Sequence, residues 1–187
     1  MFSSASLQVM NLMGQDDRSW LLGFSKEKLV DLLFLQIRNI WRVDGLYFLG
    51  IEEKFGTESA TTIDRNCWSI LAKLEARALK ELLELKSNDI EAFVTALRAT
   101  SWALYQEGKE WEVEADRAIL RITSCRTQKA RIRKGLGEFP CKQVRWTYLK
   151  EFAKEFNPEI EVNCIVCPPD KHDENLWCEW EFVLKSK

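Results

Sequence analysis

Apolar side chains in the first half of the chain recur every three or four residues, the spacing of an amphipathic helix. Ser25 is a predicted N-cap for the first stripe, which Asp44 and Gly45 interrupt before a second apolar segment runs to Gly56. Thr57 then caps the longest stripe. The spacing predicts helices over residues 25–43, 46–56, 57–85 and 88–108.

Apolar and polar positions in the second half alternate instead, as they do in strands with one buried face. Residues 111–115 and 118–122 alternate in opposite phase on either side of Asp116 and Arg117, which predicts two strands joined by a turn or bulge. A helix is expected from Pro140 to residue 156, followed by strands over residues 160–166 and 176–184. The fold class predicted is α+β, with a helical N-terminal part packed on a C-terminal antiparallel sheet and a crossing helix.

The pattern divides the chain into three parts that we expect to form one unit. Residues 1–24 lack a clear period and are predicted to be an N-terminal arm; residues 25–108 are the helical part, and residues 109–187 hold the sheet and its helix. The boundary near Gly108 is a change of composition only, because no low-complexity linker separates the two parts.

Composition narrows the class of protein. The chain has 187 residues, 46% hydrophobic and 30% charged, with a net charge of −2, so we expect a soluble protein with a full core and no general attraction to nucleic acid. No apolar stretch is long enough to cross a bilayer, and the start has neither a basic leader nor a cleavage site. We therefore expect no membrane association and a cytoplasmic location.

Four cysteines near the C-terminus are the strongest chemical feature of the sequence. Cys164 and Cys167 form a close pair before two prolines, and Cys141 and Cys178 flank that pair. Four thiolates with one such pair are typical of a structural zinc site, and an iron–sulfur cluster is the second possibility. The alternative is that Cys141 and Cys178 are small core residues, since free cysteine is often buried.

Two stretches carry a resemblance to known families. The segment PCKQVRWTYLKEFAKEFNPEIEVNCIVCPPDKHDENLWCEWEFVL resembles the 4-vinyl-reductase-like sensor domain and the L-2-amino-thiazoline-4-carboxylic acid hydrolase-like proteins. The resemblance to the sensors implies zinc bound by Cys141, Cys164 in place of an acid, Cys167 and Cys178, although the loop before Cys178 is longer here. WRVDGLYFLGIEEKFGTESATTIDRNCW and SCRTQKARIRKGLGEFPCK are similar to a family of uncharacterised prokaryotic cytosolic proteins that covers nearly the whole chain.

Aromatic and basic residues suggest a ligand pocket. Trp41, Tyr47 and Phe48 could line an apolar cavity between the helical part and the sheet, or they could simply be core. Arg126 and Arg131 could grip a carboxylate through two parallel hydrogen bonds, although a basic run of this kind is most often a solvated helix face.

A catalytic interpretation remains open beside the binding one. Cys125 could be a nucleophile activated by neighbouring positive charge, with Asp44, Asp64 or His172 as the base, or it could be a buried cysteine at the end of a strand. The preferred hypothesis is a zinc-stapled, sensor-like domain that encloses an apolar or carboxylated small molecule. The alternatives are a cysteine hydrolase and a dimerisation scaffold, and a homodimer is plausible in each case.

Overall fold

A 57-residue helix, α3 (Lys26–Leu82), is the longest element of the fold. The computed structural model describes residues 15–185, and within them a short helix, α2 (Gln15–Leu22), precedes α3. Ser25 caps α3 as predicted, because its side chain accepts a hydrogen bond from the amide of Lys28. Most of the predicted N-terminal arm, residues 1–14, lies outside the described residues.

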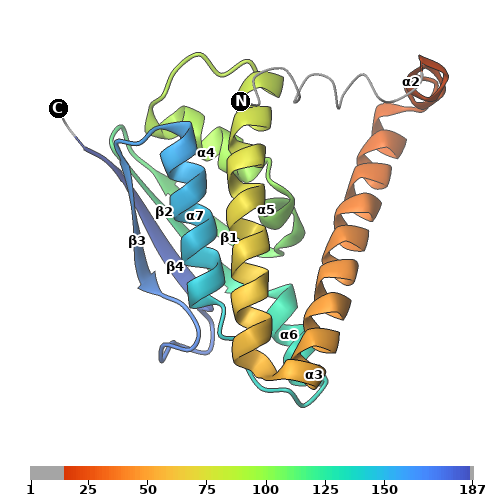
Figure 1. The fold of residues 1–187 in the computed structure, drawn as a ribbon. Coiled ribbons are helices and arrows are strands. Elements are labelled where there is room, and N and C mark those ends of the chain that lie inside the picture. Colours follow the sequence, from red (N-terminus) through yellow and green to blue (C-terminus); the bar gives the residue numbers. More distant parts are fainter. Residues whose placement is uncertain (1–14, 186–187) are drawn as a thin grey trace.

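Gly56 divides α3 into two halves that diverge in Figure 1. Its backbone dihedrals, φ 83° and ψ 164°, fall in a region that glycine tolerates and other residues avoid, so the helix kinks there. We call residues 26–55 the outer half of α3 and residues 57–82 the inner half. The predicted break at Asp44 and Gly45 is wrong: the helix continues through both, because a single glycine in a helix interior costs only about 1 kcal/mol.

Two short helices, α4 (Ile90–Arg98) and α5 (Ser101–Tyr105), replace the single helix predicted over residues 88–108. The side chain of Asp89 caps α4 by accepting a hydrogen bond from the amide of Ala92. Thr100 separates the two helices, since its buried hydroxyl accepts from the amide of Ala103 and so starts α5.

The second half of the chain forms a four-stranded antiparallel sheet, as predicted. Strands β1 (Gly108–Val113) and β2 (Arg117–Ser124) form the expected hairpin, and β3 (Ile160–Val166) and β4 (Cys178–Leu184) complete a sheet of order β1-β2-β4-β3. One face carries paired charges, with Arg117 bound to Glu181 and Arg121 to Glu179. The other face is apolar and buried.

Helix α7 (Lys142–Phe156) lies between the apolar face of the sheet and the inner half of α3 (Figure 1). Phe152 belongs to a cluster of buried rings with Phe93 of α4 and Phe182 of β4, whose ring centroids lie within 6 Å of Phe93. Helix α6 (Arg126–Arg133) follows β2 and lies near the kink of α3 (Figure 1). The α+β fold class predicted from the pattern is confirmed. Among residues 15–185 no helix is long and apolar enough to span a bilayer.

Candidate functional site

A cavity of about 380 Å³ opens where α3, α5, α6 and the start of α7 meet. Its volume lies within the range of about 300–1,000 Å³ that is usual for small-molecule sites. The outer half of α3 supplies one wall and the inner half another, so the kink at Gly56 determines how far apart these walls stand. The walls are mostly apolar, and the residues central to the site are Trp41, Asp44, Phe48, Asp64, Trp68, Trp102, Tyr105, Cys125, Arg131, Cys141 and Arg145.

A stack of three aromatic rings forms the apolar wall. Trp41 from the outer half of α3 stacks between Trp68 of the inner half, at 4.7 Å between ring centroids, and Tyr105 of α5, at 4.8 Å. The indole N–H of Trp41 donates to the backbone carbonyl of Ser101 at 3.2 Å. Because this polar group is satisfied inside the protein, the ring can stay buried and fix the position of the outer half at this level.

Arg145 of α7 is one of the cations that line the cavity, and it is only 4% exposed. Its guanidinium carbon lies 4.3 Å from the ring centroid of Trp102 and 4.8 Å from that of Tyr148. Aromatic faces of this kind stabilise a desolvated cation by about 2 kcal/mol. Among the described residues, Nε and Nη1 of Arg145 have no hydrogen-bond acceptor. A buried guanidinium with free donors in a cavity wall can recognise an acceptor group of a ligand.

Two carboxyl groups, Asp44 and Asp64, face the same cavity from the two halves of α3. Asp44 accepts a hydrogen bond from the indole N–H of Trp68 at 3.2 Å, and burial raises its pKa. Burial, together with the charge of Asp44, raises the pKa of Asp64 to about 7, although Arg145 acts in the opposite direction. The local charge of the cavity therefore changes near neutral pH.

Glu75 holds the hydroxyl of Tyr148, whose ring contacts Arg145. The hydroxyl of Tyr148 donates to Glu75 Oε2 at 2.6 Å, and Glu75 Oε1 accepts from the amide of Ser101 at 3.2 Å. Burial and the charge of Glu75 raise the pKa of Tyr148 well above its usual value, so the phenol stays a neutral donor. This chain of hydrogen bonds joins α7, the inner half of α3 and the start of α5.

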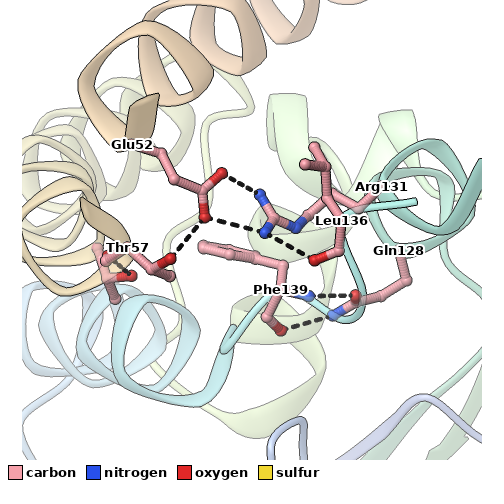
Figure 2. A network of polar contacts seen from close by, with 7 residues as sticks. Glu52, Thr57, Gln128, Arg131, Leu136 and Phe139 are labelled. Carbon is pink, nitrogen blue, oxygen red and sulfur yellow. Dashed lines mark hydrogen bonds and ion pairs between the residues drawn. The ribbon is translucent and has the colours of Figure 1, made fainter. Parts of the chain in front are cut away.

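The end of the cavity near the kink is closed by an ion pair, which we call the Glu52–Arg131 clasp (Figure 2). The guanidinium of Arg131 makes two hydrogen bonds to the carboxylate of Glu52, at 2.8 and 3.0 Å, and Thr57 donates to the same carboxylate at 2.8 Å. The hydrogen bond from Arg131 lowers the pKa of Glu52. The clasp ties α6 to the end of the outer half of α3.

Gln128 completes this closure with a two-way hydrogen bond to Phe139 (Figure 2). The side-chain amide of Gln128 donates to the Phe139 carbonyl at 2.9 Å and accepts from the Phe139 amide at 2.8 Å. Gln128 is buried, so this pairing satisfies the side chain and holds the segment before α7 on α6. The ring of Phe139 then packs against Phe48 in the cavity wall.

The predicted metal ligands occupy the junction of α7 with the sheet. The thiol of Cys167 is hydrogen-bonded to Cys141 and Cys178, which raises its pKa and lowers that of Cys141. Burial raises the pKa of Cys164 to about 11. Within residues 15–185 no set of three or more His, Cys, Asp or Glu side chains is arranged to hold a metal ion. The zinc site and the iron–sulfur alternative therefore stay predictions.

Hydrogen bonds and an ion pair hold that junction. The amide of Lys142, at the start of α7, donates to the carbonyl of Pro168 at 2.8 Å, and its ammonium group pairs with Asp170 at 2.7 Å. These contacts join the helix to the segment that follows β3, which is the connection that the zinc was predicted to supply.

Six of the predicted catalytic and ligand-binding residues line the cavity and three do not. Those that line it are Trp41, Asp44, Phe48, Asp64, Cys125 and Arg131. Tyr47 is 71% exposed. It comes one residue before Phe48, which lines the cavity, so its side chain is turned by about 100° around the helix toward solvent. Arg126 pairs with Glu107 and covers the ring of Tyr105 from outside. His172 lies elsewhere, next to Glu138 at 3.4 Å and against the ring of Trp177.

Two of the lining residues have environments that differ from the predicted ones. Arg131 has its carboxylate partner inside the chain, in Glu52, so its predicted carboxylate-binding role is filled by the protein itself. Burial raises the pKa of Cys125 to about 12, and the thiol is therefore protonated at neutral pH. Arg126 does not reverse this shift, although its positive charge was expected to activate the thiol.

Arg145 is the site residue that the sequence analysis missed. It lies four residues after Cys141 and three before Tyr148, which places a charged residue on the apolar stripe of α7. A charge at such a position is seldom buried without a specific partner, so its place on the stripe was the available indication.

Residues 22–184 match a protein family described as a family of unknown function (DUF6125), and the chain belongs to this family. No curated protein and no solved structure matches the chain.

Proposed function

We propose that this protein is a small-molecule-binding domain whose ligand is mostly apolar and carries one carboxyl group. The observation that carries this proposal is the cavity of about 380 Å³ with Arg145 in its wall. The guanidinium is nearly fully buried, and two of its nitrogens lack an acceptor among the described residues. A buried donor without a partner costs about 1–3 kcal/mol, and a ligand oxygen would recover part of this cost.

The apolar part of the ligand would contact the aromatic wall. Trp41, Phe48 and Trp68 line the cavity, and because both faces of the Trp41 indole are covered by Trp68 and Tyr105, an apolar ligand would pack against ring edges there. Since these residues come from both halves of α3, a bound ligand would hold the two halves together.

The carboxyl group would lie near Arg145, and its affinity would depend on the protonation of Asp64. The pKa of Asp64 is about 7, so this group is largely neutral at pH 6 and largely ionised at pH 8. An ionised Asp64 repels a carboxylate in the same cavity. Binding of a carboxylate is therefore expected to be tighter at pH 6 than at pH 8, and binding of an organic cation would show the opposite dependence.

The proposal requires no metal, because the contacts of Lys142 and the hydrogen bonds of Cys167 already join α7 to the sheet. Metal analysis of protein purified without chelator tests the zinc prediction separately. About one zinc per chain would support the metal prediction, and it would leave the cavity proposal unchanged.

The test is a fluorescence titration that uses the tryptophans of the cavity wall. Benzoate, cinnamate and indole-3-acetate would be compared with their neutral amides at pH 6 and pH 8. We expect an acid to bind at least about tenfold more tightly than its amide at pH 6, a difference of about 1.4 kcal/mol. Equal affinities of acid and amide at both pH values would overturn the carboxyl part of the proposal.

Variants of Arg145 sharpen this test. Arg145→Gln should lose the preference for the acid, whereas Arg145→Lys keeps the positive charge and should retain part of it. Arg98→Gln, at an exposed position at the end of α4, is the matched control and should bind like the parent protein. Native mass spectrometry of freshly purified protein gives an independent readout, because a copurified molecule would be identified directly.

A further inference from the structure

The outer half of α3 carries two apolar stripes, and only one of them is used inside the chain. The first stripe, which we call the cavity seam, includes Ile37 and Trp41, which are buried, and Asp44 and Phe48, which line the cavity. The second stripe, which we call the solvent seam, consists of Leu29, Leu33, Gln36, Ile40, Val43 and Tyr47. Each of its members comes one residue before a position of the cavity seam or of the same stripe continued back to residue 30. The solvent seam is therefore rotated by about 100° around the helix from the cavity seam.

The side chains of the solvent seam are exposed, apart from Leu29, which is half-buried. Leu33 and Ile40 are 51% exposed, Val43 is 52% exposed and Tyr47 is 71% exposed. Leu46 extends the seam at its edge, with 67% exposure, and it also lines the cavity. A helix with an apolar stripe on the side away from its own core is typical of one that packs against a second partner.

The spacing of the solvent seam identifies that partner as a helix. Its positions follow one another at intervals of four, three, four, three and four residues, which is the heptad pattern of helices that pack side by side. Charged residues of this segment, including Asp31, Arg38 and Arg42, lie outside the seam. A row of apolar residues without positive charge also does not favour nucleic acid or an anionic lipid surface.

We propose that the partner is a second copy of this chain and that the two outer halves pair across a two-fold axis through their solvent seams. A two-fold interface uses the same patch on both copies, and a uniform heptad seam is complementary to itself. Gln36 is the one polar member of the seam and could meet its equivalent across the axis, as single polar residues do when they fix helix register.

The exposed apolar area is large enough for a stable dimer. Five large apolar side chains of the solvent seam and its edge are at least 51% exposed: Leu33, Ile40, Val43, Leu46 and Tyr47. At on the order of 100 Å² each they offer roughly 500 Å² of apolar area per copy, which is about the non-polar share of the roughly 800 Å² per partner in a standard interface. Pairing would cover much of this area and brace the wall of the cavity to which Leu46 belongs.

The first experiment measures molecular mass by light scattering and sedimentation across 1–100 µM protein. We expect about twice the chain mass of 21.9 kDa. Ile40→Glu places a charge in the centre of the seam and should weaken the dimer by at least about 100-fold, which is about 2.7 kcal/mol. Arg38→Glu also introduces an acid on the same helix but outside the seam, and it should leave the dimer intact.

The second measurement is amide hydrogen exchange of residues 29–47 at low and high protein concentration. Protection that rises with concentration in the parent protein and is absent in the Ile40→Glu variant supports the pairing. Circular dichroism shows that the variant is folded, which is expected because Ile40 is exposed in the single chain. A monomer at 100 µM, or a dimer that survives Ile40→Glu with no protection over residues 29–47, would overturn the proposal. Neither result depends on whether the cavity binds a carboxylate.

Discussion

The buried stripe of α7 is packed in two different ways along its length. Near the C-terminal end of the helix, Phe152 joins an apolar cluster with Phe93 and Phe182, where the contacts are those of a close-packed core. Near the N-terminal end, Arg145 and Tyr148 lie on the same stripe but contact a cavity and the carboxylate of Glu75. The C-terminal part holds the fold together, whereas the N-terminal part buries polar groups at a cost in stability, as expected of a binding site.

The largest effect is expected in the apolar, C-terminal part of α7. Phe152→Ala removes a fully buried ring and leaves a void, so the free energy of unfolding should fall by about 4 kcal/mol. Urea unfolding followed by circular dichroism measures this loss. A loss below about 1 kcal/mol would mean that the cluster is loosely packed and that the two parts of α7 are packed less differently than proposed.

The cavity side should show a stability that depends on pH. The pKa of Asp64 is about 7 in the folded protein and near 4 when unfolded, so the folded state holds a proton between these values that the unfolded state releases. The free energy of unfolding should therefore fall as the pH rises from 4 to 7 and level off above 7.

Asp64→Asn isolates this contribution. In this variant the free energy of unfolding should not show the fall between pH 4 and 7 that Asp64 causes. At pH 8 the variant should be more stable than the parent protein by on the order of 3 kcal/mol. Thermal melts at pH 5 and pH 8 provide the comparison. Asp31→Asn, at an exposed position of the same helix, should leave the pH dependence unchanged.

The Glu52–Arg131 clasp is expected to contribute less than either of these. Glu52→Gln leaves the buried guanidinium of Arg131 without its charged partner and should cost about 2 kcal/mol. Chemical denaturation tests the cost, and the fluorescence of Trp41 and Trp68 reports whether the cavity wall moves. If stability and fluorescence were both unchanged, the clasp would not be what closes the cavity.

The smallest effect concerns the chemistry of the cysteines. At pH 7 a maleimide should react with exposed Cys67 much faster than with Cys125, because burial keeps the pKa of Cys125 at about 12. Mass spectrometry of the labelled peptides gives both rates. If Cys125 reacted with the maleimide as fast as Cys67, the hypothesis that Cys125 is a nucleophile in the cavity would be supported.

The periodicity of the sequence was sufficient to predict most of the fold. Helical spacing and strand alternation can each be read from a single segment without knowing its neighbours in space. The β1–β2 hairpin, α7 and the last two strands were all predicted in this way. The continuity of α3 through Gly45 was not, since it depends on contacts such as the stack of Trp41 with Trp68 and Tyr105 from distant parts of the chain.

The site was only partly predictable for the same reason. Asp44, Asp64 and Trp41 stood out as acids and aromatics on apolar stripes, and the structure brings them to one cavity. The role of Arg145 depends on rings supplied by α3 and α5. The pairing of Arg131 with Glu52 joins residues 79 positions apart. The place of Arg145 on an apolar stripe was visible in the sequence, but the partners of Arg145 and Arg131 were not.

The dihedral angles of Gly56 set the direction of the outer half of α3, so a small change in them moves distant residues of that half the most. Trp41 lies fifteen residues from Gly56, or about 22 Å along the helix. A rotation of ten degrees at Gly56 would displace the indole of Trp41 by about 4 Å, roughly the width of a methyl group. The Glu52–Arg131 pair lies only four residues from Gly56, so the same rotation moves it far less. The angle set at Gly56 is therefore held most sensitively by contacts distant from the kink, such as the stack of Trp41 with Trp68 and Tyr105.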